Sequence, residues 1–211
     1  MRSLKHWTAR YVFDRSCSAI DEWRHPEDPW LTRQAINLLE SLLRASDEVL
    51  EFGSGRSTIW FARRVASVVT VEDDPAWHQE VGSRLTKAKL QNVEQILCGG
   101  KPAGGDNSVS DTALYMDVLQ QFPDRSIDIV LVDGQARAVC ATGSLPKMRP
   151  GGLLILDNAE WFLPSTTRAP GARRSNAEAR DAWIDFEAAT ASWRRVWTTN
   201  GVFDTVIWFK P

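Results

Sequence analysis

The sequence Val49-Leu-Glu-Phe-Gly-Ser-Gly-Arg-Ser57 indicates the fold more directly than any other part of the chain. Its apolar start reads as a short buried strand, and the glycines at 53 and 55 allow a sharp turn into a helix. Glycines also let the backbone approach a ligand without a Cβ in the way. The stretch therefore predicts a strand, a ligand-binding turn and a helix.

Strand and helix patterns alternate on both sides of this turn. Apolar and β-branched runs predict further strands at 67–71, 93–97, 127–132 and 153–156. Helices are expected at 31–44, 57–65, 75–89, 111–122, 136–148 and 176–191. Two last strands flank Asn200-Gly201, a strong hairpin signal. The pattern predicts a Rossmann-like α/β fold with a seven-stranded, mostly parallel sheet, an antiparallel C-terminal hairpin and helices on both faces.

Composition and charge narrow the class of protein. The chain has 211 residues, 43% of them hydrophobic, and a formal net charge of -2, so it has no overall positive field to attract nucleic acid. Its three cysteines show no metal or redox spacing, which is typical of a reducing cytoplasm. The N-terminus lacks a signal-peptide pattern, and no apolar run could span a membrane. We expect a cytoplasmic protein with no membrane partner and no nucleic-acid partner.

Two acidic residues flank the glycine turn and indicate which ligand it binds. Glu51 precedes the turn, where a carboxylate can pair with a cationic ligand but would repel a pyrophosphate. Glu72 ends the next predicted strand, where an acid can accept hydrogen bonds from ribose hydroxyls. Thr58 stands where a dinucleotide fingerprint would have glycine or alanine. The pattern favours a cationic nucleoside over NAD.

Four motifs together resemble the class I S-adenosylmethionine-dependent methyltransferases. They are Val49–Gly55, Val71-Glu72, Ile129-Val-Leu-Val-Asp133 and Pro150-Gly-Gly-Leu-Leu-Ile-Leu156, and the resemblance covers roughly residues 47–209. It implies S-adenosylmethionine as methyl donor, Glu72 on the ribose, and the segment from Cys98 to Gly100 beside the adenine. The candidate cofactor-binding residues are Glu51, Gly53, Ser54, Gly55, Ser57, Glu72, Asp73, Trp77 and Asp133. Trp77 either flanks the adenine or only packs.

Polar side chains also follow the fourth and fifth predicted strands. Asp133, Asp157 and Asn158 should face one crevice, because parallel strands end at the same edge of a sheet. Their oxygens could hold Mg²⁺, which would lower the pKa of an acceptor hydroxyl. The arrangement resembles metal-dependent O-methyltransferases that act on catechols and caffeoyl-coenzyme A. A second reading needs no metal and makes Asp133 or Asp157 the proton acceptor.

The resemblance has one departure at this site. Those metal-dependent enzymes carry a lysine just after the first aspartate, whereas this chain offers Arg137, which cannot act as a base near neutral pH. Arg137 could instead clamp a substrate carboxylate or phosphate, or pair with Asp133. The candidate catalytic residues are Asp133, Asp157 and Arg137, and the candidate metal ligands are Asp133, Asp157 and Asn158. His25 is a further candidate base, and Trp161 is well placed to touch substrate.

The leading hypothesis is methyl transfer from S-adenosylmethionine to an oxygen of a small polar acceptor, with Mg²⁺ assistance as one option. The alternatives are an NAD-type oxidoreductase and a catalytically inactive cofactor-binding protein. Residues 1–46 are expected to form a tryptophan-rich N-terminal cap, irregular in its first thirty residues, followed by one helix. Residues 47–211 are expected to form the S-adenosylmethionine-binding methyltransferase domain. A homodimer is compatible with the sequence.

Overall fold

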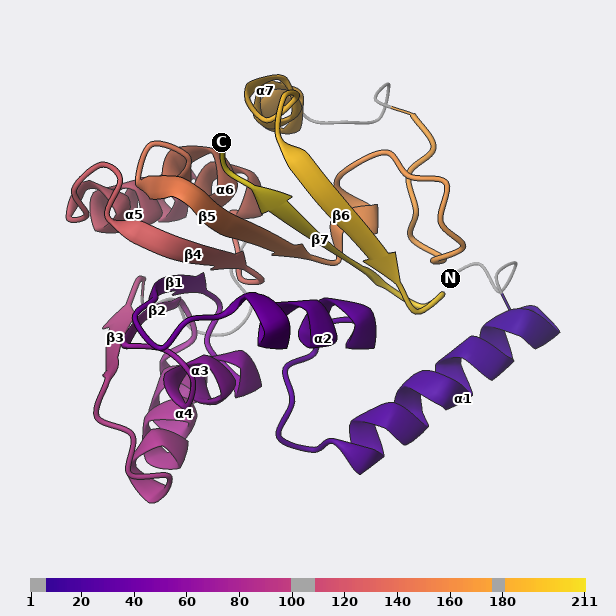
Figure 1. The fold of residues 1–211 in the computed structure, drawn as a ribbon, viewed down its shortest axis with the longest axis horizontal. Coiled ribbons are helices and arrows are strands. Elements are labelled where there is room, and N and C mark those ends of the chain that lie inside the picture. Colours follow the sequence, from indigo (N-terminus) through magenta and orange to yellow (C-terminus); the bar gives the residue numbers. More distant parts are fainter. Residues whose placement is uncertain (1–6, 100–108, 176–180) are drawn as a thin grey trace.

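A seven-stranded sheet forms the centre of the computed structural model, which describes residues 7–99, 109–175 and 181–211 (Figure 1). The strands are β1 (Glu48–Phe52), β2 (Ser67–Glu72), β3 (Val93–Leu97), β4 (Ile127–Val132), β5 (Met148–Asp157), β6 (Arg194–Thr199) and β7 (Asp204–Phe209). Their order across the sheet is β3-β2-β1-β4-β5-β7-β6. β1 to β5 are parallel, and β7 is antiparallel to β5 and β6. The predicted fold class is therefore confirmed.

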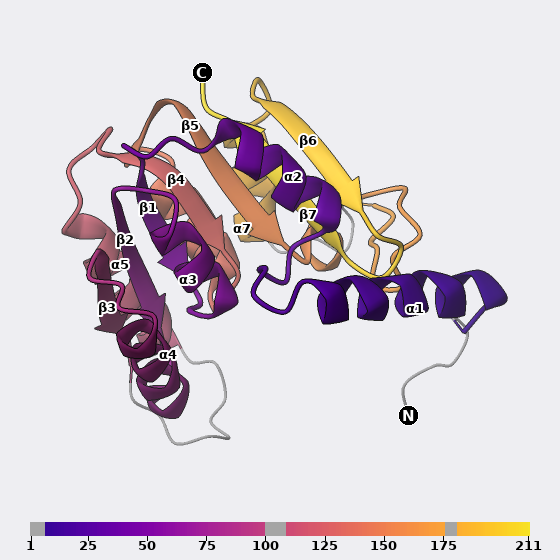
Figure 2. The same cartoon turned by 60° about the horizontal axis from the view of Figure 1, so that its bottom comes forward.

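Helices cover both faces of this sheet. They are α1 (Ala9–Arg24), α2 (Arg33–Leu42), α3 (Arg56–Ala62), α4 (Pro75–Lys87), α5 (Val109–Gln120), α6 (Arg137–Ser144) and α7 (Asp181–Ala189), with a short 3₁₀ helix, η2 (Ala159–Trp161). α5, α6 and α7 lie on one face, and α2, α3 and α4 on the other (Figures 1 and 2). Successive β1 residues alternate between the two cores, since Leu50 and Phe52 face the first group and Val49 faces the second.

The first thirty residues differ from the prediction of an irregular segment. Residues 9–24 form α1, and Thr8 caps its first turn by accepting a hydrogen bond from the backbone of Tyr11. The apolar side chains recur at helical spacing, but they face solvent, because Phe13 and Trp23 are 60% and 80% exposed. The helical pattern was therefore present in the sequence, although the apolar stripe does not face the core.

Several element boundaries also differ from the prediction. β5 begins at Met148 and includes Pro150-Gly-Gly152, which was expected to end a helix. Its pairing with β4 shifts register there, and a proline fits a strand only at such an irregularity, since it lacks an N–H to donate. α6 accordingly ends at Ser144. α5 begins at Val109, before the expected cap at position 111, and the start of the predicted helix 176–191 lies outside the described residues.

Candidate active site

Two glycines bring the turn after β1 into contact with the turn after β4. Gly53 has a φ of +96°, and a Cβ there would lie 2.6 Å from the backbone nitrogen of Gly134. A Cβ on Gly134 would in turn lie 2.9 Å from the nitrogen of Gly53. The backbone of Asp133 donates to the carbonyl of Phe52 at 2.8 Å. Only glycines permit this close approach, and it places Asp133 directly beside the glycine turn.

A cavity of about 800 Å³ opens at the ends of these strands. Its lining includes eight of the nine residues predicted to bind the cofactor: Gly53, Ser54, Gly55, Ser57, Glu72, Asp73, Trp77 and Asp133. Trp161 lines the same cavity. We call it the cofactor cavity. The order of the sheet explains the grouping, because β2, β1 and β4 are neighbours and end at one edge.

Glu72 fixes the shape of the cofactor cavity. One of its carboxylate oxygens accepts hydrogen bonds from the backbone N–H (3.0 Å) and the hydroxyl (2.9 Å) of Ser54. The other accepts from the backbone N–H groups of Asp73 and Asp74, both at 3.0 Å. Trp77 also supports the turn, because its indole N–H donates to the carbonyl of Ser54 at 2.7 Å. The carboxylate of Glu72 thus joins the glycine turn to the start of α4.

Glu51 is the exception among the predicted cofactor ligands. Its side chain is fully buried (0% exposed) and lines no cavity described here. One carboxylate oxygen accepts hydrogen bonds from the hydroxyls of Thr58 and Thr70, and the Thr58 hydroxyl in turn accepts the N–H of Gly55 at 2.8 Å. The geometry therefore gives Glu51 a role in holding the turn, and its direct contact with the cofactor stays a prediction. This role also explains why threonine stands at position 58, where the dinucleotide fingerprint would have glycine or alanine, since its hydroxyl links Gly55 to Glu51.

The supporting role of Glu51 predicts the behaviour of Glu51→Gln. Burial raises the pKa of Glu51 from 4.5 to about 7, so the wild-type protein loses stability as the pH rises through that range and the carboxyl ionises. Glutamine can still accept from both threonines, and its amide would replace the oxygen that has no partner among the described residues. Between pH 5 and pH 8, urea unfolding should show the wild-type protein losing about 3 kcal/mol more stability than the variant.

Glu51→Gln also tests whether Glu51 only supports the turn or contacts the cofactor directly. If Glu51 only holds the turn, calorimetry should show that the affinity for S-adenosylhomocysteine changes by less than about threefold. Glu94→Gln, an exposed position on the outer strand β3, controls for the change in net charge. A loss of affinity of roughly tenfold or more in Glu51→Gln alone would restore the direct contact predicted from sequence.

A second cavity, of about 420 Å³, lies between the N-terminal helices and the ends of β4 and β5. Asp133, Asp157 and Asn158 line it, together with polar residues of α1. Trp30, Arg56 and Asp133 line both cavities. We call the second cavity the acceptor cavity. Asp133 is the only carboxylate among the residues that line both, so it marks the point where the two cavities meet.

Arg137 occupies the space among the three predicted metal ligands. Its guanidinium donates to the side chain (2.9 Å) and carbonyl (2.7 Å) of Asp133, to the side chain of Asn158 (3.3 Å) and to the carbonyl of Asp157. Of the two roles considered for Arg137, the structure shows the pairing with Asp133. Clamping a substrate anion would require breaking these bonds.

The residues present do not fit a Mg²⁺ site. The fixed positive charge of Arg137 already lies among the oxygens that would coordinate the ion. The carboxylate of Asp157, which is 3% exposed, accepts a hydrogen bond from the Thr205 hydroxyl at 2.9 Å. Among the described residues, no three histidine, cysteine, aspartate or glutamate side chains are arranged to hold a metal ion. The metal-assisted option is therefore not supported by the donor set.

Burial and charge set the protonation of the two aspartates. Burial raises the pKa of Asp133 to about 6, an increase that the neighbouring Arg137 opposes. Burial and the charge of Asp133 raise the pKa of Asp157 well above its ordinary value. The two aspartates therefore differ in their surroundings, because Arg137 pairs with the side chain of Asp133 but only with the main-chain carbonyl of Asp157.

Sequence reasoning predicted an N-terminal cap with His25 near the site, but it did not identify the other residues of α1 that line the acceptor cavity. Asp14, Ser18, Asp21 and His25 line it from one face of α1 and from its C-terminal cap. Their spacing of three or four residues is the helical signal that could have found them. His25 lies 3.8 Å from the carboxylates of both Asp21 and Asp28, so it reaches the cavity as the sequence reading allowed. Its role as a base stays a prediction.

Comparison with known proteins identifies the family. Residues 50–159, about half of the chain, match the sequence profile of a family described as a methyltransferase domain. This chain belongs to that family. With its seven-stranded sheet and C-terminal hairpin, it is a class I S-adenosylmethionine-dependent methyltransferase. A search of curated proteins found none with significant similarity to the chain.

Solved methyltransferase structures share the fold. An O-methyltransferase from Bacillus cereus, solved in complex with SAH, is 17% identical, with a TM-score of 0.60 over 97% of this chain and 91% of that one. A methyltransferase-like protein from Silicibacter pomeroyi is 19% identical, with a TM-score of 0.57 over 87% of this chain and 89% of that one. At these identities the likeness concerns the fold alone. In the described part of this methyltransferase, no helix is long and apolar enough to cross a membrane.

Proposed function

We propose that this methyltransferase transfers the methyl group of S-adenosylmethionine to a hydroxyl of a small polar acceptor. The position of Asp133 carries the proposal, because it is the carboxylate that lines both cavities. A neutral hydroxyl must lose its proton as it attacks, and a carboxylate beside it can take that proton. An amine beside carboxylates would tend to stay protonated and lack a free electron pair. The site therefore favours oxygen as the nucleophile.

The cofactor cavity fits S-adenosylmethionine, which would supply a methyl group on a cationic sulfur. Gly53 and Gly134 let the turns after β1 and β4 pack directly against each other beside this cavity, and Gly55 lines it at the start of α3. Glu72 lies at the end of β2, where its carboxylate can hold the ribose hydroxyls. Trp77 lines the wall next to the turn and can flank the adenine. Part of the segment 98–100, which the family resemblance places near the adenine, lies outside the described residues.

The chain's own groups contribute mainly position and one proton transfer. The walls of the two cavities hold the acceptor oxygen in line with the methyl group and exclude water. Asp133 takes the hydroxyl proton and later releases it to solvent. Arg137 keeps the Asp133 carboxylate in place through a hydrogen bond of 2.9 Å. Its positive charge also favours the ionised form of that carboxylate, which is the form a base requires.

We also propose a revised division of the chain. The predicted cap comprised residues 1–46, but α2 buries Ala35, Ile36 and Leu39 in the same core as β1. Of the two N-terminal helices, α1 contributes no residue to that core and lies apart from the sheet (Figure 2), and both helices contribute residues to the lining of the acceptor cavity. The cap is therefore α1 with the segment that follows it, and α2 belongs with the sheet.

Transfer of labelled methyl groups tests this function. The protein should first bind S-adenosylhomocysteine in calorimetry and then label hydroxyl compounds from a broad acceptor panel. Because Arg137 occupies the metal position, a chelator should change the rate by less than about twofold, and added Mg²⁺ should not raise it. Mn²⁺ titration followed by electron paramagnetic resonance should show no tight site. Loss of activity with chelator that Mg²⁺ restores would establish the metal-assisted mechanism instead.

Cofactor binding without transfer to any acceptor would favour the third hypothesis, a catalytically inactive cofactor-binding protein. The NAD alternative gains no support from the family match or from the fold comparisons. Binding of NAD in place of S-adenosylhomocysteine would revive it.

A further inference from the structure

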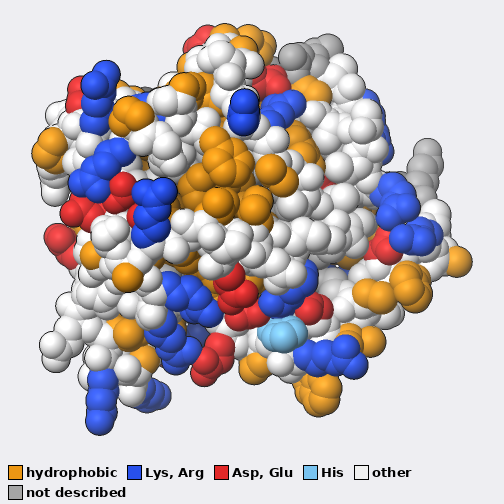
Figure 3. Space-filling model, viewed as in Figure 1, with side chains coloured by type: hydrophobic (Ala, Val, Ile, Leu, Met, Phe, Trp, Pro, Cys, Tyr) orange, Lys and Arg blue, Asp and Glu red, His pale blue; other side chains and the backbone are white. Residues whose placement is uncertain are grey.

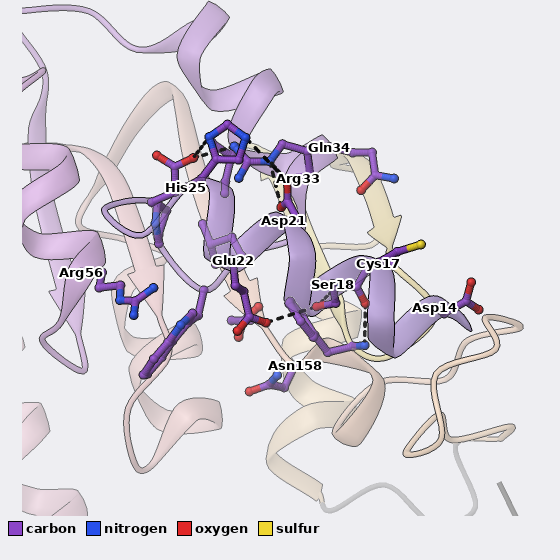
Figure 4. A pocket seen from close by; sticks show the side chains of 18 of the residues that line it. Asp14, Cys17, Ser18, Asp21, Glu22, His25, Arg33, Gln34, Arg56 and Asn158 are labelled. Atoms are coloured by element: carbon purple, nitrogen blue, oxygen red, sulfur yellow. Dashed lines mark hydrogen bonds and ion pairs between the residues drawn. The ribbon is translucent and has the colours of Figure 1, made fainter. Parts of the chain in front are cut away.

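Arg56 is the first residue of α3 and directly follows the glycine turn. Like Trp30 and Asp133, it lines both the cofactor cavity and the acceptor cavity. Figure 4 shows the side chain of Arg56 extending from α3 toward the other residues that line the acceptor cavity. Arg56 is therefore the basic residue at the junction of the two cavities.

Other arginines near this junction are paired with acids. Figure 3 shows acidic and basic side chains next to one another between α1 and the sheet. Arg33 pairs with Asp21 at 3.0 Å and with Asp28 at 2.6 Å. Arg137 pairs with Asp133 at 2.9 Å. The partners of each side chain, and not the net charge of a cavity, therefore decide which cation is available to a ligand.

Arg56 has no acidic partner in the described part of the chain. Its guanidinium lies over the ring of Trp30, with 5.0 Å from the guanidinium carbon to the ring centre, and it forms no ion pair or hydrogen bond with the described residues. A cation–π contact holds a guanidinium by its charge and leaves most of its N–H donors free. Trp30 therefore orients Arg56 while its donors stay available to a ligand.

The proposed reaction brings the amino-acid end of the cofactor close to this junction. The methyl-bearing sulfur has to lie where the two cavities meet, because its methyl group passes to an acceptor beside Asp133. A short carbon chain joins that sulfur to the carboxylate of the methionine part of the cofactor. The carboxylate therefore has to bind near the residues that line both cavities, and Arg56 is the cation among them.

We propose that Arg56 binds the carboxylate of the methionine part of S-adenosylmethionine, and that Trp30 holds the guanidinium in place. This inference rests on the proposed function, because that function sets where the sulfur lies. Arginine suits the role, since its planar guanidinium can bind both oxygens of one carboxylate through charge-assisted hydrogen bonds. Arg56 thus adds a cofactor-binding residue to those predicted from the sequence.

Two ligands that differ in the carboxylate test this contact. Calorimetry without acceptor would compare S-adenosylhomocysteine with its decarboxylated analogue, whose tail keeps only the ammonium group. The wild-type protein should bind S-adenosylhomocysteine roughly tenfold or more tightly than the analogue. Arg56→Gln should reduce that preference to less than about threefold. Arg56→Lys keeps the charge but cannot bind both oxygens in the same way, so it should lower the preference by at least about threefold.

Two other arginines provide matched controls. Arg63→Gln removes a positive charge beside the end of α3, at an exposed position that lines neither cavity, and it should keep the preference. Arg173 lines the cofactor cavity from the segment after η2 but does not line the acceptor cavity, so Arg173→Gln should also keep it. Loss of the preference in Arg173→Gln but not in Arg56→Gln would assign the carboxylate to Arg173 instead.

The outcomes distinguish this contact from the proposed function. Equal binding of the two ligands by the wild-type protein would overturn the role of Arg56. So would a variant at position 56, glutamine or lysine, that is folded by circular dichroism and keeps the full preference. If Arg56 showed the expected discrimination but no hydroxyl compound were methylated, the proposed function alone would be wrong. If S-adenosylhomocysteine did not bind at all, both proposals would be wrong.

Discussion

Asp133→Asn is expected to lower the turnover number by roughly 10²- to 10⁴-fold, the usual contribution of a general base. Asparagine has the same shape and can still accept the hydrogen bond from Arg137, which is 2.9 Å long in the wild-type protein. It cannot accept a proton from the acceptor hydroxyl. The backbone of the site should be unchanged, because the contacts between Gly53 and Gly134 do not involve the Asp133 side chain. The affinity for S-adenosylhomocysteine should therefore change by less than about threefold.

Initial rates with labelled donor, measured at saturating acceptor, test this expectation together with calorimetry. Asp117→Asn is the matched control, since Asp117 is exposed on α5 and lines neither cavity. If Asp133→Asn retained a turnover number within about threefold of the wild type, the base would have to be another group of the acceptor cavity. Asp157 and His25 would then be the next residues to replace. A parallel loss of cofactor affinity would indicate damage to the turn.

The sequence was sufficient to predict the sheet, because most strands are rich in apolar and β-branched residues and the turns between them carry glycine or polar signals. The turn of residues 53–55 and the acids at the ends of β2 and β4 were placed correctly in one crevice, since parallel strands end at the same edge. These predictions depend on local pattern and on general rules of sheet topology. They did not require knowledge of individual side-chain contacts.

The features that the sequence left open or did not show depend on contacts between distant segments. Glu51 lies near the end of β1, as a ligand-binding acid would, but its carboxylate accepts hydrogen bonds from the hydroxyls of Thr58 and Thr70. Arg137 was left with two roles, and only the three-dimensional placement of Asp133 decided between them. The inner face of α1 was missed because the apolar stripe of that helix faces solvent, so the usual pattern did not mark it as part of the domain.

Glu72→Ala is expected to weaken the binding of S-adenosylhomocysteine by at least about 100-fold, or about 2.7 kcal/mol. Two losses add in the same direction. The ribose hydroxyls lose a charged acceptor, and each such hydrogen bond contributes about 1.5–3 kcal/mol. The glycine turn also loses its tie to the start of α4, because the Glu72 carboxylate accepts from Ser54 on one side and from Asp73 and Asp74 on the other. Glutamine should not rescue binding, since its amide would face backbone donors in either orientation.

Comparison of two ligands separates the ribose contact from support of the turn. The wild-type protein should bind S-adenosylhomocysteine more tightly than its 2′-deoxyribose analogue, and Glu72→Ala should bind the two almost equally, as in a double-mutant cycle. Ser54→Ala removes only the hydroxyl that donates to Glu72 at 2.9 Å, so it should keep the discrimination. Glu80→Ala, at an exposed position on α4, controls for the loss of a carboxylate. If the variant and the wild type preferred S-adenosylhomocysteine over its 2′-deoxyribose analogue by the same factor, the ribose would have to bind elsewhere in the cavity. Removing a carboxylate that contacts the hydroxyls would reduce that preference.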